Sequence, residues 1–194
     1  MILLLLACGP KKTGAAPDDY FPLIEGTKYH YVATFNGMDF AETRVAMNVG
    51  LGDGSEGWAF VEEDEIGDSV AGAFTGNFGL GLYRNTGSAV ETIEAFWLSE
   101  ADQRDKSQWQ TMLDLPLTPG ASVKMDTDSP DRSGAITVVG FETVTVPAGT
   151  YSNCAHLDLG QEGSEAWLCP GVGLVKWVLV TGRVEQLAAV DWPS

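Results

Sequence analysis

Apolar and polar side chains alternate along most of the chain with a period of two residues, which is typical of half-buried β-strands. The clearest early case is the segment from Lys28 to Phe35, where Tyr29, Tyr31 and Ala33 alternate with less apolar neighbours. Asn36-Gly37 follows as a tight-turn dipeptide, and residues 41–49 return as a second strand. The same reasoning predicts further strands over residues 57–62, 70–74, 78–83, 122–125, 135–141, 174–180 and 183–190.

About ten short strands separated by glycine and proline turns predict an all-β domain. We expect a curved antiparallel sheet or partly closed barrel, with a sandwich as the alternative. Residues 90–98 fit either a strand or the start of a helix. A helix is expected over residues 99–112, because Ser99 and Asp102 are spaced as a capping box. At most one or two short helices therefore accompany the sheet.

The stretch from Thr143 to Val178 has the most consistent hairpin pattern. If Gln161 and Glu162 form a two-residue turn between flanking glycines, Cys154 lies opposite Cys169. One face of the hairpin is then apolar and carries Ala155, Leu157, Leu159, Ala166 and Leu168. The other face carries Cys154, His156, Asp158, Trp167 and Cys169. A one-residue slip would separate the cysteines and mix the faces, so both signals favour one register.

The facing cysteines predict a disulfide between Cys154 and Cys169, provided that the chain is exported to an oxidising compartment. Closing this loop would stabilise the fold by about 3 kcal/mol in the chain-entropy description. The alternative is a pair of small buried thiols, which fits the same pattern.

Composition and charge limit the classes of partner. The chain has 194 residues, of which 44% are hydrophobic and 20% charged. This is enough for one sizeable core, so we expect a single β-rich domain over residues 20–194. The 27 acidic and 11 basic side chains give a formal net charge of −16. Such a charge repels phosphate backbones, and no nucleic-acid partner is expected.

The N-terminus reads MILLLLACG, in which Leu5-Leu6-Ala7-Cys8 resembles the lipobox of a bacterial lipoprotein signal. The resemblance implies that residues 1–7 are a signal peptide, that Cys8 is lipidated and that Gly9 permits sorting to the outer membrane. Residues 8–19 would form a lipidated, flexible tether. No Lys or Arg precedes the apolar run, which is also shorter than the about 7 to 15 residues of a usual signal core. The alternative is an apolar strand in which Cys8 is an ordinary buried thiol.

Candidate catalytic motifs are incomplete. Gly67-Asp68-Ser69-Val70 resembles the nucleophile segment of one lipase and esterase class, which also needs a downstream Asp-x-x-His. Asn153 stands where that aspartate would precede His156. The acidic residues 62–65 are interpreted as a solvated loop, and residues 76–81 lack dinucleotide-binding spacing. We therefore predict no catalytic residue and no enzyme.

Metal-binding patterns are also incomplete. His30 and His156 are the two histidines, and neither belongs to a cluster with zinc-ligand spacing. Residues 126–131 carry three carboxylates but lack the glycine and the final acid of a calcium loop. We predict no metal and no cofactor.

Four short modules stand out: Tyr20-Phe21-Pro22-Leu23 with Gly26 and Tyr31, Leu115-Pro116-Leu117 with Gly120, Val144–Tyr151 followed by Cys154, and Pro170–Lys176. Together they resemble a family of uncharacterised secreted bacterial lipoproteins. The resemblance implies a curved antiparallel sheet akin to the open-barrel lipoprotein carriers of the bacterial envelope, and it brings no catalytic residues. Cys169 stands where alanine is common in that pattern, so the disulfide would be peculiar to this branch.

Three functions remain open at this point. The first is a non-enzymatic outer-membrane lipoprotein, facing the periplasm, with a structural or protein-interaction role in the envelope. The second is a carrier or sensor that holds an apolar or lipidic ligand on the concave face of the sheet. The third is an enzyme of an unrecognised kind. The expected partners are the membrane, through the lipid anchor, and an envelope protein or lipid.

Overall fold

The computed structural model describes residues 18–50, 56–62, 82–93, 109–125, 134–161 and 163–194. Within these residues the chain forms twelve β-strands and no helix. The strands are β1 (Lys28–Phe35), β2 (Met38–Gly50), β3 (Glu56–Glu62), β4 (Leu82–Asn85), β5 (Ala89–Ile93), β6 (Gln110–Asp114), β7 (Ser122–Met125), β8 (Gly134–Val146), β9 (Gly149–Asp158), β10 (Glu165–Cys169), β11 (Gly173–Val178) and β12 (Val184–Asp191). The described part therefore contains no helix of the length and hydrophobicity that crossing a membrane requires.

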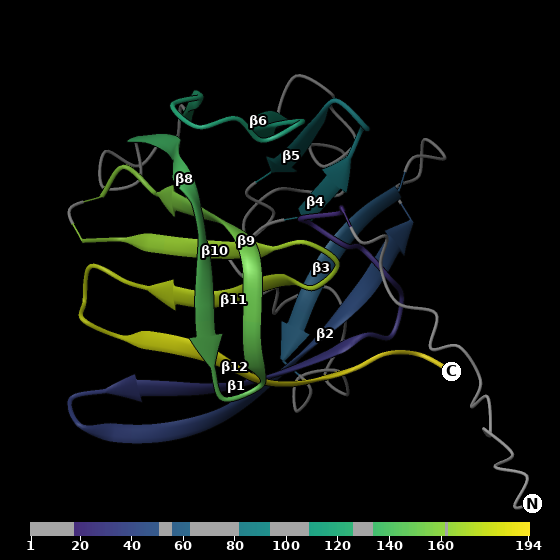
Figure 1. The fold of residues 1–194 in the computed structure, drawn as a ribbon. Helices are drawn as coiled ribbons and strands as arrows, with labels where there is room; N and C mark the ends of the chain where they lie inside the picture. The colour runs from purple at the N-terminus through teal and green to yellow at the C-terminus, as the bar shows by residue number, and fades with distance from the viewer. Residues whose placement is uncertain (1–17, 51–55, 63–81, 94–108, 126–133, 162) are drawn as a thin grey trace, which may run out of the picture.

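All twelve strands belong to one antiparallel sheet, in the order β6-β5-β4-β3-β2-β1-β12-β11-β10-β9-β8-β7. Each half of the chain is an up-and-down meander, and the pairing of β1 with β12 joins the two halves. The sheet curls until its end strands, β6 and β7, come into contact without pairing (Figure 1). The all-β prediction is confirmed, with a nearly closed barrel of twelve strands rather than about ten.

The main core lies on the concave face of the sheet. Alternation along β1 points Tyr29, Tyr31 and Ala33 into it, and all three are buried. Aromatic rings fill the region between β1 and β4, where Phe60 lies edge-on to Tyr29 at a centroid distance of 5.8 Å. A second, smaller cluster lies on the opposite face of β3 to β6 and comprises Ala59, Val61, Leu82, Ile93 and Trp109. Strands β3 to β5 are thus buried on both faces.

Two hairpins form where the sequence predicts them. Asn36 and Gly37 join β1 to β2 with φ angles of 51° and 74°, and glycine adopts such positive values without a side-chain clash. The last hairpin turns at Thr181-Gly182, where the Gly182 amide donates to the Leu179 carbonyl. These turns set the register of the strands at the junction between the two halves.

The expected helix over residues 99–112 is wrong at its C-terminal end. Residues 110–114 form β6, which pairs with β5, and residues 99–108 lie outside the described part of the chain. A register shift between Val90 and Glu91 interrupts the regular alternation of β5 against β6, and such irregular pairing hides a strand from pattern reading. Residues 89–93 are a strand, which settles that end of the ambiguous segment 90–98. The predicted strand over 70–74 lies outside the described residues.

Candidate functional site

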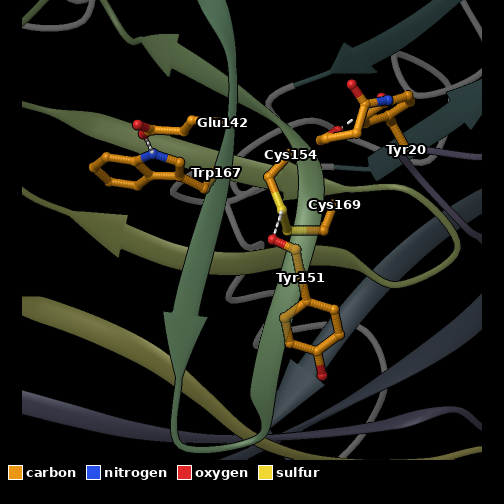
Figure 2. The surroundings of a disulfide bond; sticks show 7 residues. Tyr20, Glu142, Tyr151, Cys154, Trp167 and Cys169 are labelled. Atoms are coloured by element: carbon orange, nitrogen blue, oxygen red, sulfur yellow. Dashed lines mark hydrogen bonds between the residues drawn. A yellow bond between two sulfur atoms is a disulfide. The ribbon is translucent and has the colours of Figure 1, made fainter.

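The disulfide hairpin forms in the predicted register. His156 lies opposite Trp167 and Leu157 opposite Ala166, and Cys154 is bonded to Cys169. Figure 2 shows the disulfide with Tyr151 beside it, and the sulfur of Cys154 lies 3.5 Å from the Tyr151 carbonyl oxygen. Both cysteines are fully buried. The bridge is therefore part of the core and is not accessible to a dissolved thiol while the domain is folded.

The turn of this hairpin is longer than the predicted two residues. The Leu159 amide donates to the Ser164 carbonyl, and the Ser164 amide donates to the Gln161 carbonyl. The turn is thus longer by two residues on each strand, 159–160 after β9 and 163–164 before β10. Because the extension is equal on both sides, the pairing register is the predicted one. The positive φ angles of Gly160 and Gly163 explain why the turn is glycine-rich.

The face that was predicted to be polar holds a stack of side chains across β8 to β11. The ring of His156 stacks on Trp167 at 4.6 Å, and the Lys176 ammonium lies 4.3 Å from the centre of the same indole ring. Trp167 donates through Nε1 to Glu142 (Figure 2). Both faces of this indole are occupied by its own neighbours. Trp167 therefore serves as packing between strands, and not as a free stacking platform for a ligand.

The two histidines do not form a metal site. His156 places Nδ1 3.7 Å from Glu142 and Nε2 3.5 Å from Glu165, on opposite edges of its ring. His30 lies on β1 and contacts Thr43 and Asp191 through its two ring nitrogens. Strands β12, β11 and β10 separate β1 from β9. Across the described part of the chain, no group of three His, Cys, Asp or Glu side chains is arranged to hold a metal ion.

Several other predicted positions fall outside the described residues. They are Cys8 with residues 1–17, the Gly67–Val70 motif, the acidic residues 63–65, the glycine-rich segment 76–81 and the carboxylates of residues 126–131.

Residues 19–23, here called the N-terminal arm, are built into the barrel. The Asp19 carbonyl accepts a hydrogen bond from the Gly171 amide in the β10–β11 turn. The Tyr20 hydroxyl donates to the Asn153 carbonyl at 2.9 Å and accepts from the Asn153 side chain at 2.6 Å. Phe21 is buried, with its ring 5.4 Å from Tyr83 and 6.0 Å from Phe60. The arm thus ties β3 and β4 in the first meander to β9 and the β10–β11 turn in the second.

The carboxyl group of Asp19 caps the arm. Its Oδ1 accepts a hydrogen bond from the Phe21 amide at 2.9 Å. Burial raises the pKa of Asp19, the hydrogen bond from Phe21 opposes this effect, and the charge of Asp18 adds to it. The arm therefore begins at a partly desolvated turn and not as free chain.

Four charged side chains, Glu42, Arg44, Arg183 and Glu185, form a closed ring on the concave face, here called the ion ring. Arg44 donates to Glu185 at 2.9 Å and to Glu42 at 3.0 Å. Arg183 donates to Glu42, and its Nε lies 2.8 Å from Glu185 in an ion-pair contact without hydrogen-bond geometry. Each carboxylate is thereby shared by both guanidinium groups.

Burial gives the ion ring its energetic importance. Only 5% of the Arg44 side chain and 2% of the Glu185 side chain are exposed. Burial acts to lower the pKa of Arg44, but the charge and hydrogen bond of Glu185 outweigh it, so the pKa lies above its ordinary value. The Arg44 guanidinium also lies 5.1 Å from the centre of the Tyr31 ring. The ring bridges β2 and β12 over β1, where the small Ala33 leaves room for it.

The sequence carries a signal for the ion ring that pattern reading missed. Glu42 and Arg44 are two residues apart, as are Arg183 and Glu185, so each strand presents an acid and a base on one face. Their contact depends on β2 and β12 both flanking β1, which is not readable from either segment alone.

Beyond the ion ring, towards the β1–β2 turn, the concave face is apolar and exposed. Phe35, Met38 and Phe40, here called the tip strip, continue the alternation of Tyr31 and Ala33 and lie on the same face. Met38 is 58% and Phe40 43% exposed. The β1–β2, β9–β10 and β11–β12 turns lie together at this end of the sheet, here called the tip end (Figure 1). The arm contacts the β10–β11 turn, at the opposite end of β11 and about 20 Å away.

Comparison with solved structures finds two chains with a related arrangement of strands. One is a candidate lipoprotein from Parabacteroides distasonis, with a TM-score of 0.42, 15% sequence identity, and coverage of 91% of this chain and 100% of that chain. The other is a candidate exported protein with a YmcC-like fold from Bacteroides fragilis, with a TM-score of 0.42, 13% identity, and coverage of 88% of this chain and 98% of that chain. Likeness at this level carries no conclusion about function. No family model matches the chain, and no curated protein matches it.

Proposed function

We propose that the chain is a non-enzymatic outer-membrane lipoprotein, anchored through Cys8, whose β-barrel domain faces the periplasm and serves a structural or protein-interaction role. The docked N-terminal arm is the observation that carries this proposal. Because residues 19–23 belong to the barrel, the tether between a lipidated Cys8 and the domain shrinks to residues 9–18. Ten residues reach at most about 35 Å when fully extended, so the domain stays next to the membrane.

The disulfide supports the proposed compartment. Cys154 and Cys169 are bonded in the core, and such bonds persist in oxidising compartments such as the periplasm. The lipobox of Leu5 to Cys8 leads the chain to the same place. Two independent parts of the sequence thus agree on export.

The exposed apolar side chains at the tip end favour an interaction role over a purely passive one. Met38 and Phe40 are 58% and 43% exposed there. Exposed apolar surface of this kind is available to another protein.

Membrane fractionation tests the anchor. The Cys8→Ser variant should leave the membrane fraction and appear in the periplasmic extract, because acyl chains cannot be attached to serine at that site. The double variant Cys154→Ser/Cys169→Ser is the matched control, since it replaces two other cysteines with serine without touching the lipobox and should stay in the membrane fraction. Continued membrane retention of Cys8→Ser would contradict the lipoprotein proposal.

The carrier of an apolar ligand remains the second candidate, because the tip strip lies on the concave face. The ion ring counts against a deep lipid site, since an acyl chain that passed beyond the strip would lie against the charged side chains of Glu42 and Arg183. Native mass spectrometry of the protein purified from membranes distinguishes the two. A co-purifying lipid lost in the Phe40→Ser variant would favour the carrier.

A further inference from the structure

We propose that the Cys154–Cys169 disulfide is a latch for the N-terminal arm, which docks on the barrel once the two cysteines are bonded. This inference goes beyond the function proposed above and does not depend on the lipid anchor. In the second meander the arm contacts two separate segments, and one cysteine belongs to each of them. The bond between the cysteines therefore fixes the distance between the two docking points.

The first docking point is Asn153 on β9, the residue before Cys154. The Tyr20 hydroxyl donates to the Asn153 carbonyl and accepts from the Asn153 side chain. Asn153 has a φ angle of 57°, which few residues other than glycine adopt. The pairing of β8 with β9 shifts its register here, between Glu142 and Val144, and the extra residue of such a bulge is left out of the ladder. Tyr20 thus holds a special backbone conformation directly next to Cys154.

The second docking point is the β10–β11 turn, which follows Cys169 directly. The Gly171 amide donates to the Asp19 carbonyl at 2.7 Å. Gly173 lies opposite Cys169 in the ladder between β10 and β11. A Cβ atom on Gly173 would come within 3.2 Å of the Pro22 ring, so the arm packs directly on the backbone at this position. The course of the arm here depends on where Cys169 holds the turn.

The disulfide joins the two docking points where the strands no longer pair. Within the described strands, the ladder between β9 and β10 ends at the pair Ala155–Leu168. The cysteines lie one residue beyond this pair and are linked by their sulfur atoms (Figure 2). Without that bond the two segments can separate. The arm would then lose the advantage of two attachments held at a fixed spacing.

The latch closes by thiol–disulfide exchange. Each cysteine gives up its S–H bond, one S–S bond forms between them, and a disulfide-bearing oxidant takes up the two electrons and two protons and leaves as two thiols. Such oxidants act in exported compartments. The arm is thus undocked in a reduced chain and docks after oxidation. By linkage, a docked arm in turn favours the bonded state of the cysteines.

Chymotrypsin cleavage after Tyr20 tests the latch in the full chain carrying Cys8→Ser. Cleavage after Tyr20 should be at least about tenfold faster in Cys154→Ser/Cys169→Ser than in the matched control, a modest part of the advantage of two linked attachments over one. The control is Leu187→Ala, which removes a fully buried side chain on β12 and destabilises the barrel while leaving both docking points unchanged. Slow cleavage after the buried Tyr31 shows that the barrel stays folded in both variants. Equal rates after Tyr20 would overturn the proposal.

A second test measures the reverse coupling, in chains that keep both cysteines. Tyr20→Phe removes the hydroxyl that contacts Asn153. The ratio of bonded to reduced cysteines at a fixed dithiothreitol concentration, measured by mass after alkylation, should fall about three- to tenfold, the scale of losing a hydrogen bond. Tyr151→Phe is the matched control, because Tyr151 lies beside the bridge with its hydroxyl directed away from it (Figure 2). The ratio should not change in this control.

An unchanged ratio in Tyr20→Phe would overturn the proposal, because the arm would then dock equally well on the bonded and on the reduced barrel. A fall of the same size in Leu187→Ala would also overturn it, since general destabilisation would then explain both results. Neither test depends on the Cys8 fractionation experiment, so the lipid anchor and the latch can fail separately.

Discussion

Replacing Glu185 with glutamine tests whether the ion ring holds the barrel together. Glutamine keeps the size of the side chain but removes the charge that faces Arg44 and Arg183. Breaking a buried ion pair by removing one partner costs about 3 to 5 kcal/mol, since the remaining charge stays buried without compensation. The amide oxygen can still accept one hydrogen bond, so we expect the lower value, about 3 kcal/mol. For a chain of this length that loss lowers Tm by about 6 to 12 °C.

Urea unfolding followed by tryptophan fluorescence measures the loss. Urea is preferred to guanidinium, because an ionic denaturant would screen the charges under test. Asp191→Asn is the control, since 70% of the Asp191 side chain is exposed and its ion pair with His30 lies at the surface. The control should lose less than about 1 kcal/mol.

A double-mutant cycle separates the ion ring from simple damage to the core. Arg44→Met/Glu185→Leu removes one buried base and one buried acid together, so no charge is left unpaired. Apolar replacement of a complete buried pair is often neutral, and the double variant should be more stable than the sum of its two single losses predicts. Additive losses, or a Glu185→Gln cost below about 1 kcal/mol, would refute the reasoning.

Three further results are expected from the same unfolding assay. Cys154→Ser/Cys169→Ser should lose about 3 kcal/mol, and reductant should then have no further effect on its stability; a loss below about 1 kcal/mol would show that the bridge is dispensable. Burial raises the pKa of Tyr31 above its ordinary value of 10.0, so the folded state keeps a proton that the unfolded state releases. The stabilising contribution of this group is therefore fully present below pH 10, and the free energy of unfolding should fall above pH 10 by about 1.4 kcal/mol per pH unit. The Tyr31→Phe variant should show a smaller slope. An unchanged slope in that variant would mean that Tyr31 is not the group responsible. Phe21→Ala should cost about 3 kcal/mol, whereas an unchanged urea midpoint would mean that the arm is not part of the cooperative core.

Local signals made much of the fold predictable. The β9–β10 hairpin was predicted in its correct register because the glycine-rich turn, the facing cysteines and the apolar alternation each favour the same pairing. Asn36-Gly37 alone was sufficient for the β1–β2 hairpin, since few dipeptides adopt two successive positive φ angles. In both cases the contacts join residues that are close in the sequence.

The features that were not predicted from the sequence depend on contacts between distant parts of the chain. The charged residues of the ion ring are 141 positions apart in the sequence where Arg44 meets Glu185, and in isolation each pair resembles the solvated face of a strand. Residues 110–112 of β6 were assigned to the end of a helix, because Ser99 and Asp102 are spaced as a capping box. The strand character of this segment comes from its pairing with β5. The Tyr20–Asn153 contact spans 133 positions and has no local sequence pattern.

The order of strands in the sheet explains why these few distant contacts are important for holding the barrel together. Strands β1 to β6 form one meander and β7 to β12 the other, and in the described chain only the β1–β12 pair joins them through a strand ladder. At the other side of the barrel, β6 and β7 touch without pairing. The ion ring reinforces the junction from inside, by linking β2 to β12, and the arm links β3 and β4 to β9 and the β10–β11 turn. Each meander can form from local contacts, so the ion ring and the arm decide whether the two halves stay together as one barrel.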